Sequence, residues 1–428
     1  MRAPGYGPSA SRSDILVAFM LRTTLLPQSS DAQAHLALRN QQNPCRRVTA
    51  FFMVAALFCS SFLTFQVSVA QSRSPAPSSF SELQQRAEQA HQSNNTEEQV
   101  RLYRKLVTLR PSWGEGWWYL GTGLYDLRRY SEAVNAFRRL SRIDLKDGSS
   151  WALMGLSEFQ LHNYDDSLKD LFRAEELSMG PNQQMVLTVR YHIALLLNRS
   201  GQFEWARDHL TAFGWLGDVS DPIIEAVGVN TLRMPILPDE LPADKLDMVM
   251  KAGRATWEPS LAGHPEQSNK IFEELVATYP REPNLHYAYG VRLLDSDPEG
   301  ALREFQKELE VNPKQVVARL QIVFLTLKQG DSEGAMALAR EAVKLAPDYF
   351  LAHIALGRTM LVAGRTAAAI QELQTAVRLE PKSPENHFDL AEAYRAAGRK
   401  LEAEKEQSEF LRIKKGRERL GGGPLTPQ

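Results

Sequence analysis

Three histidines are the residues of this chain that most invite a chemical role. His286, His353 and His387 recur at one position of a repeat, and the last two lie 34 residues apart. Imidazole is a common zinc ligand, but all ligands of a zinc ion must lie about 2 Å from it. Equivalent atoms of neighbouring helical repeats are roughly 10 Å apart, the spacing of packed helices. We therefore expect these histidines to be structural and predict no metal site.

The carboxylates show no catalytic arrangement either. Glu304, Glu308 and Glu310 follow the spacing of a solvated helix face, so we predict that they lie on the surface. The chain also has no phosphate-binding glycine loop, no G-x-S-x-G elbow and no H-E-x-x-H helix. We predict no catalytic residues, no cofactor-binding residues and no enzymatic activity.

The elements that position these residues repeat every 34 residues. Alanine, glycine and proline mark the period at Ala301, Ala335, Ala369, Ala403, Gly330, Gly364, Gly398, Pro313, Pro347 and Pro381. Alanine suits the place where two helices approach closely, and glycine suits the left-handed residue that ends a helix. Proline suits the turn between one helix pair and the next. This pattern predicts stacked helix–turn–helix units, which bury their apolar faces only against one another.

Weaker copies precede the regular ones. One runs Trp117-x-x-Leu120-Gly121, followed by Ala133 and Phe137, and the next begins at Trp151. This pattern resembles the tetratricopeptide repeat. The resemblance implies an all-α fold, a right-handed superhelical solenoid of stacked repeats, that binds a protein or peptide partner.

We predict about nine units and the following organisation along the chain. The ranges are a leader (1–45), a signal peptide or membrane anchor (46–70), a linker (71–79), N-terminal repeats (80–220), a degenerate repeat with a proline-rich insertion (221–248), C-terminal repeats (249–411) and a disordered tail (412–428). In the degenerate repeat, Arg233 to Pro242 replaces the expected second helix.

An uncharged, apolar segment follows Arg46 and Arg47 and predicts export. The segment ends in Ser68-Val69-Ala70, with small residues at the two positions that signal peptidase inspects, so we expect cleavage after Ala70. The alternative is a single transmembrane helix over Val48 to Phe65, since about 18 residues can just span a bilayer. In both cases the repeats lie outside the cytoplasm, periplasmic or secreted if cleaved. The leader itself indicates a start codon placed too far upstream.

The charge and the cysteine content of the chain exclude some partners and some kinds of site. The chain has 50 basic and 51 acidic residues, so no general field attracts nucleic acid. Both cysteines, Cys45 and Cys59, precede the expected cleavage site. The mature chain would therefore have no cysteine catalysis, no thiolate metal site and no disulfide, and we expect helix stacking alone to stabilise it.

In tetratricopeptide proteins the first helix of each pair lines a concave groove, and the resemblance implies an aromatic groove here. Its predicted residues are Trp118, Tyr125, Phe159, Tyr191, Tyr287, Phe324, Arg358 and Phe388. The alternative is that these aromatic side chains fill the core between helices. Basic and amide residues are only scattered along the groove, which argues against a carboxylate clamp; they are Asn198, Arg199, Lys328, Arg358 and Arg395.

Two classes of function remain open from the sequence. The first is a non-catalytic scaffold or adaptor that holds a protein partner outside the cytoplasm. The second is a glycan- or peptide-binding accessory subunit of an envelope enzyme or secretion complex, in which Trp118, Tyr125 and Tyr287 would stack on sugar rings. Neither class involves nucleic acid, and the membrane enters only through the N-terminal segment.

Overall fold

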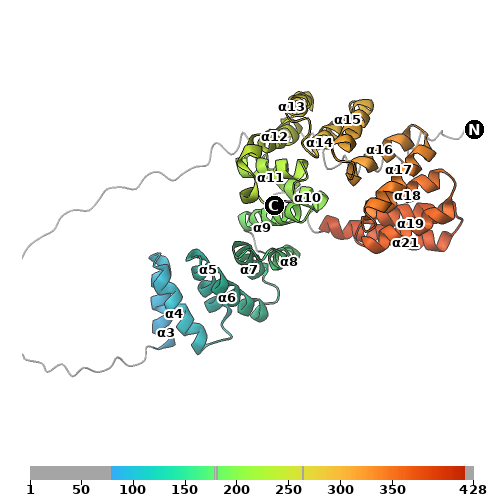
Figure 1. Ribbon diagram of the computed structural model, residues 1–428. Coiled ribbons are helices and arrows are strands. Elements are labelled where there is room, and N and C mark those ends of the chain that lie inside the picture. Colours follow the sequence, from blue (N-terminus) through green and yellow to red (C-terminus); the bar gives the residue numbers. More distant parts are fainter. Residues whose placement is uncertain (1–78, 178, 180–181, 263–264, 420–428) are drawn as a thin grey trace, which may run out of the picture. The chain divides into compact units, whose positions relative to one another are not determined.

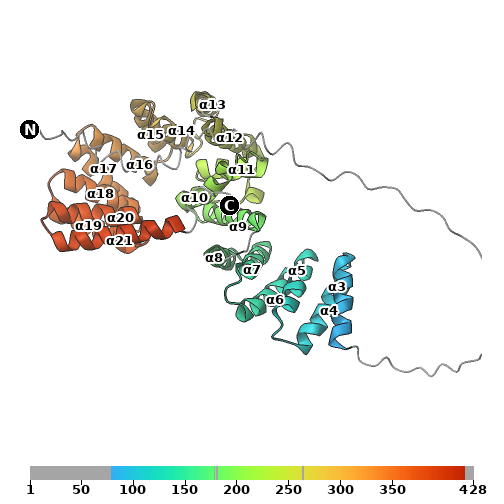
Figure 2. The same ribbon diagram turned by 180° about the vertical axis from the view of Figure 1, so that it is seen from behind.

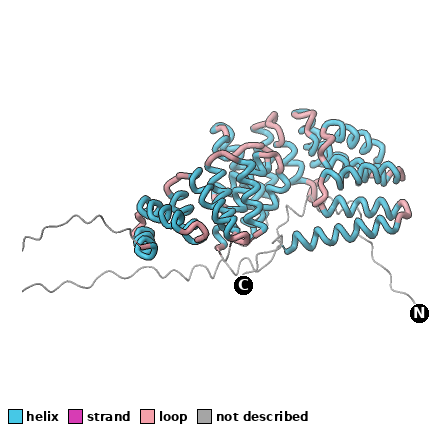
Figure 3. The backbone as a smooth tube through the Cα atoms, turned by 90° about the horizontal axis from the view of Figure 1, so that it is seen from below, coloured by secondary structure: helices cyan, strands magenta, loops and turns pink. Residues whose placement is uncertain are grey.

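The computed structural model describes residues 79–419 except 178, 180–181 and 263–264, and this part of the chain is helical without any strand (Figure 3). It divides into two compact units, which meet in sequence between residues 136 and 137. The predicted leader, signal peptide or anchor and the cleavage site lie outside the described residues. Among the described helices, none is long and apolar enough to cross a membrane.

The described part of the first unit, from residue 79 onward, contains three helices and the start of a fourth. They are α3 (Phe80–Gln92), α4 (Thr96–Leu109), α5 (Gly114–Asp126) and α6 (Tyr130–Ile143), of which α6 continues into the second unit. A capping box starts α3: Glu82 N–H donates to Ser79 Oγ at 3.2 Å, and Ser79 N–H donates to the Glu82 carboxylate at 3.1 Å. Helix α4 packs between α3 and α5.

The second unit stacks the remaining helices in chain order. They are α7 (Gly148–Gln160), α8 (Tyr164–Glu176), α9 (Gln183–Arg199), α10 (Phe203–Trp215), α11 (Asp221–Thr231), α12 (Leu246–Ala262), α13 (Pro265–Thr278), α14 (Leu285–Leu293), α15 (Pro298–Val311), α16 (Val316–Lys328), α17 (Ser332–Leu345), α18 (Phe350–Val362), α19 (Thr366–Leu379), α20 (Pro384–Ala396) and α21 (Lys400–Arg419). From α7 onward, each helix packs on the next one in the chain. Helices α18 to α21, for example, lie side by side (Figures 1 and 2).

The predicted roles of alanine and glycine in the repeat are confirmed. Ala335 and Ala369 are completely buried at the helix crossings. The three glycines that end first helices have left-handed backbones, with φ of 90° at Gly330, 74° at Gly364 and 73° at Gly398. The all-α fold of stacked helix–turn–helix repeats is therefore confirmed.

The degenerate repeat differs from our prediction. A loop with two short 3₁₀ helices, Pro238–Glu240 and Ala243–Lys245, follows α11, but α12 then packs on α11 as its second helix. The two helices cross at glycines, where a Cβ on Gly228 would overlap the Val249 carbonyl oxygen. The proline-rich segment thus lengthens the turn instead of replacing the helix, because glycines still allow the helices to meet.

The recurrent histidines tie each unit to the preceding one. Their Nδ1 atoms lie 2.6–2.7 Å from glutamates of the following helix, and their Nε2 atoms lie 2.8–3.3 Å from proline carbonyls. The triplets are Pro280–His286–Glu304, Pro347–His353–Glu372 and Pro381–His387–Glu406. Carboxylates and carbonyls are both acceptors, so both nitrogens of each ring face an acceptor. The predicted structural role of these histidines is confirmed.

Arginine makes the same connection where histidine is missing. Arg319 occupies the equivalent position and donates to the Pro313 carbonyl at 2.8 Å and to the Glu341 carboxylate at 3.2 Å. In the first unit, Trp117 Nε1 donates to the Pro111 carbonyl at 2.9 Å. Five side chains at this position, those of Trp117, His286, Arg319, His353 and His387, thus contact the proline carbonyl that closes the previous helix pair.

Two glutamates that we predicted on the surface are buried. Glu304 is 7% exposed because it faces His286, and Glu308 is fully buried. The Glu308 carboxylate accepts from the backbone N–H of Asn284 at 2.8 Å and of Tyr287 at 3.2 Å, so it caps the start of α14. The surface prediction was wrong because the repeat period places these positions between helices, and it holds only for Glu310.

The last helix is longer than expected. Helix α21 continues to Arg419, so residues 412–419, which we placed in a disordered tail, are helical. It packs on α20. Three clusters of buried apolar side chains lie along the second unit, over α9–α12, α11–α16 and α16–α21.

Replacing a recurrent histidine should destabilise the C-terminal repeats. His353→Ala leaves the Pro347 carbonyl and Glu372 without their shared donor, for a loss of about 1–3 kcal/mol in unfolding free energy. His353→Arg should recover much of this loss, because Arg319 makes both bonds at the equivalent position. Denaturant unfolding measures the three proteins, and an arginine variant no more stable than the alanine variant would contradict the assignment.

A half-buried cluster of three charged side chains connects α8, α9 and α10. His209 Nε2 lies 3.2 Å from Glu175 Oε2, and Arg190 Nε donates to Glu175 Oε1 at 3.2 Å. Burial alone would lower the pKa of His209, but the hydrogen bond and charge of Glu175 outweigh it, so that pKa is raised above its ordinary 6.5. Burial would raise the pKa of Glu175, yet His209 and Arg190 hold it below its ordinary 4.5.

Stability should therefore depend on pH through this pair. The raised pKa of His209 contributes stability that is complete below about pH 6.5 and is lost as pH rises through the folded-state pKa. The lowered pKa of Glu175 contributes stability that is lost as pH falls below about 4.5. We expect the difference in unfolding free energy between the protein and His209→Gln to shrink from pH 6 to pH 8. A constant difference across this range would exclude the linkage.

Candidate binding pocket

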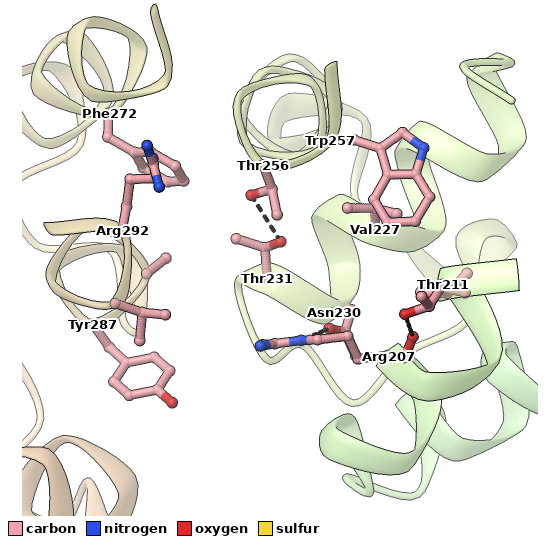
Figure 4. A pocket seen from close by; sticks show the side chains of 13 residues that line it. Arg207, Thr211, Val227, Asn230, Thr231, Thr256, Trp257, Phe272, Tyr287 and Arg292 are labelled. Atoms are coloured by element: carbon pink, nitrogen blue, oxygen red, sulfur yellow. Dashed lines mark hydrogen bonds between the residues drawn. The ribbon is translucent and has the colours of Figure 1, made fainter. Parts of the chain in front are cut away.

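A pocket opens in the second unit between α10–α12 on one side and α13–α14 on the other (Figure 4). Figure 4 shows Phe272, Tyr287 and Arg292 on one wall, facing Thr256 and Trp257 on the other. The remaining lining residues are Arg207, Leu210, Thr211, Val227, Asn230, Thr231, Ala288 and Val291. The pocket is therefore mostly apolar, with a few polar groups.

Buried asparagines fix the wall that α10 and α11 form. Asn230 Nδ2 donates to Asn198 Oδ1 at 2.8 Å and to the Phe203 carbonyl at 2.7 Å, and Asn198 Nδ2 donates to the Ala226 carbonyl at 3.2 Å. Both side chains are at most 3% exposed. Since buried amides are costly without partners, this network fixes α9, α10 and α11 relative to one another.

The glycine crossing of α11 and α12 forms the next part of the same wall. A Cβ on Gly253 would overlap the Ile224 carbonyl oxygen, so only glycine permits this approach. It brings Thr231 and Thr256 together, with their hydroxyl oxygens 3.1 Å apart. The Trp257 Nε1 donates to the Asp218 carbonyl at 2.8 Å, which fixes the indole against the pocket.

Two arginines are the charged groups among the lining residues. Arg207 Nε donates to Asn230 Oδ1 at 3.5 Å, a long hydrogen bond, and its guanidinium extends into the space between the walls (Figure 4). Burial lowers the pKa of Arg292, although Asp295 and Glu266 act in the opposite direction. The pocket therefore carries positive charge within a largely apolar wall.

A third arginine lies beside the pocket. Arg233 follows α11 with a left-handed backbone, φ 49°, and its guanidinium stacks over Phe203 with 4.7 Å to the ring centroid. It donates to Glu204 at 2.8 Å. Burial disfavours the charged forms of both Glu204 and Arg233, but the attraction between the two side chains outweighs this effect. The pKa of Glu204 is therefore lowered and that of Arg233 is raised. This pair attaches the long α11–α12 loop to α10.

The structure does not gather the predicted groove residues at one site. Tyr287 lines the pocket, with 6% exposure. Phe324 lies in the core at 7% exposure, because the stacking of α16 on α17 and α18 covers it, as the alternative of a core-filling role describes. Arg358 forms two hydrogen bonds of 2.8 and 2.9 Å with the carboxylate of Asp389. That carboxylate is itself buried, at 6% exposure.

The other aromatic side chains are half-buried and mostly contact one another. Phe159 packs edge-to-face on His192, with 4.8 Å between centroids, and Phe388 contacts Phe410 at 5.7 Å. Tyr191 packs on the α9–α12 core, and burial raises its pKa to about 12. Trp118 and Tyr125 belong to the first unit. A ligand-binding role for these five residues remains a prediction.

The scattered basic and amide residues also have structural partners. Asn198 belongs to the buried amide network, Arg199 pairs with Glu240 at 3.2 Å, and Arg395 pairs with Glu392 and Gln407. Lys328 ends α16.

Sequence reasoning missed the residues that build the pocket, including Arg207, Asn230, Trp257 and Arg292. They fall on five helices around the degenerate repeat, where the 34-residue period is interrupted. One signal in the sequence could have pointed to the pocket: Gly228 and Gly253 allow two helices to cross closely. It could be recognised only by someone who already knew that α11 pairs with α12.

Other surfaces of the described residues show less. A hollow on the first unit runs along α4 and is lined by charged side chains, of which Arg101 pairs with Glu98 and Arg104 with Glu132. Within the described residues, no group of three or more histidine, cysteine, aspartate or glutamate side chains could hold a metal ion.

Comparison with known proteins identifies the repeats. A family model described as tetratricopeptide repeat matches residues 120–183, and a second with the same description matches residues 326–385 and 360–408. The chain therefore contains tetratricopeptide repeats, which generally serve as interaction scaffolds. No curated protein matches the sequence significantly.

Three of the solved structures that match the chain are the following. MamA from Desulfovibrio magneticus RS-1 is 20% identical, covering 39% of this chain and 96% of that chain, with a TM-score of 0.34. A chain of the APC/C hetero-tetramer Cut9–Hcn1 is 14% identical, covering 78% and 79%, at 0.34. YrrB, described as having an unusual peptide-binding site, is 13% identical, covering 40% and 88%, at 0.32.

The amide network gives a test of how the pocket wall is held. Asn230→Ala leaves the Asn198 carbonyl oxygen and the Phe203 carbonyl without their donor, which should cost about 1–3 kcal/mol of unfolding free energy. Asn198→Ala should cost a similar amount, and the double variant less than the sum, since the two amides share one bond. Denaturant unfolding of the unchanged protein, the two single variants and the double variant measures these free energies. Additive losses would show that the amides act independently.

Proposed function

We propose that this chain is a non-catalytic scaffold that holds an extended segment of a protein partner, outside the cytoplasm, in the pocket between α10–α12 and α13–α14. The observation that carries the proposal is the pocket itself, which combines apolar walls with separate hydrogen-bonding groups. Extended peptides are recognised by such surfaces, since pockets accept side chains and polar groups bind the peptide backbone.

The polar groups of the pocket suit a peptide backbone. The hydroxyls of Thr231 and Thr256 lie along one wall, beside Asn230, whose amide hydrogens both bond within the chain. Such groups both donate and accept hydrogen bonds, as a peptide unit requires. Their positions are fixed by the asparagine network and the glycine crossing, so a bound segment would meet a preorganised wall.

The proposed location follows from the N-terminal sequence. The apolar segment after Arg46 and Arg47 favours export, with cleavage near Ala70 or retention as a single anchor. The chain from Gln71 onward contains no cysteine, so its folding needs no particular redox compartment.

A glycan ligand has less support in this pocket. Of the three residues that sequence reasoning assigned to sugar stacking, the pocket contains only Tyr287, and its 6% exposure leaves little ring surface for a sugar. Trp118 and Tyr125 belong to the first unit and do not line it. A peptide needs no exposed aromatic face and therefore fits the pocket better.

Selection from a displayed random 12-residue peptide library tests the proposal with the full chain. Thr256→Trp fills the pocket. The control is Thr278→Trp, which places the same side chain at an exposed position of α13. The two threonines are matched, because each hydroxyl donates to the backbone carbonyl four residues earlier in its own helix. Selected peptides should bind the unchanged protein and Thr278→Trp with equal affinity. Their affinity for Thr256→Trp should be lower by about tenfold or more. No selected peptide, or equal binding to both variants, would refute the pocket as the site.

A further inference from the structure

We infer that the pocket recognises a carboxylate side chain next to an apolar one, so that the bound segment carries aspartate or glutamate beside a hydrophobic residue. This inference rests on the proposed function and specifies the ligand of the same site. It follows from the sign and placement of the charges that line the pocket. Arg207 and Arg292 are its charged lining residues, and both are positive.

The positive charge is a local feature of the pocket. The whole chain is nearly neutral, with a formal net charge of −1, so it exerts no general attraction on acidic partners. The lining residues Arg207 and Arg292 come from α10 and α14, which lie on opposite walls (Figure 4). Figure 4 shows the Arg292 side chain beside Phe272 on one wall and the Arg207 guanidinium extending from the other, so a ligand carboxylate would meet either one of them.

The surroundings of Arg292 favour an added negative charge. Burial disfavours its cation, and the attraction of Asp295 and Glu266 does not fully offset that effect, so the pKa of Arg292 is lowered. A ligand carboxylate would stabilise the charged form, and the attraction would be strong because the apolar wall limits screening by water. The gain on binding would thus be larger than at an exposed arginine.

Arg207 is positioned to take part in the same contact. Its Nε faces the buried amide of Asn230, which the network with Asn198 holds in place. The guanidinium extends into the space between the walls, and Leu210, one helical turn away on α10, also lines the pocket (Figure 4). A ligand carboxylate at Arg207 would therefore place a neighbouring apolar side chain near Leu210 at the pocket wall.

Another arginine of this chain shows the geometry that such a contact would use. Arg358 binds Asp389 through two parallel hydrogen bonds of 2.8 and 2.9 Å, with the carboxylate buried. Bidentate pairs of this kind are stronger and more directional than single contacts. A ligand carboxylate at Arg207 or Arg292 would reproduce this arrangement between two molecules.

The test uses the selected peptides in two synthetic forms, one with the acidic residues and one with Asp→Asn and Glu→Gln. The full chain should bind the acid form about tenfold or more tightly than the amide form, and this preference should shrink between about 0.1 and 0.5 M sodium chloride. Arg207→Gln with Arg292→Gln should remove the preference. The corresponding lysine double variant should retain most of it, since it keeps both charges.

Two controls separate the possible outcomes. Lys251→Gln with Arg303→Gln removes two exposed charges outside the pocket and should leave the preference unchanged; circular dichroism verifies that each variant is folded. Peptides that depend on an open pocket, as judged with Thr256→Trp, but bind equally in both forms would overturn the inference and leave the proposed function standing. A preference lost equally in the control variant would also overturn it. If no peptide binds at all, both proposals fail.

Discussion

The structure depends on one constraint: a pair of short helices cannot bury its apolar face unless the next pair packs on it. Close packing requires a small side chain where helices cross, and completely buried Ala335 and Ala369 supply it. It also requires that the turn between pairs be held, and His353 or Arg319 does this by donating to a proline carbonyl. Repetition of these contacts defines the stack.

The pocket arises where the repetition is interrupted. A long loop separates α11 from α12, so these helices cannot use the tight turn of the regular repeats and meet through Gly228 and Gly253 instead. Polar side chains then replace apolar ones in the wall, with Asn198 and Asn230 satisfying each other. A regular repeat fills its interior with side chains, whereas this irregular one leaves an opening lined by arginine and threonine.

Charge follows the same division between regular and irregular parts. In the regular repeats, buried charges are matched within the chain, as Arg358 is by Asp389 and His387 by Glu406. These pairs hold helices together and offer little to a ligand. Around the pocket, Arg233 is matched by Glu204, while burial of Arg292 is only partly offset by its acidic neighbours. The electrostatic character of the candidate site thus comes from the degenerate repeat and its surroundings.

The sequence alone determined the repeat, because spacing fixes which residues share a helix face: the alanines, Gly330 and the structural histidines could all be placed from the 34-residue period. Burial of Glu304 and Phe324, and the pairing of α11 with α12, depend on what packs against each helix, which the period does not encode. Only the tertiary structure placed Arg207, Asn230 and Arg292 around one pocket. They lie on α10, α11 and α14, and the long loop between α11 and α12 interrupts the repeat period that would relate these helices.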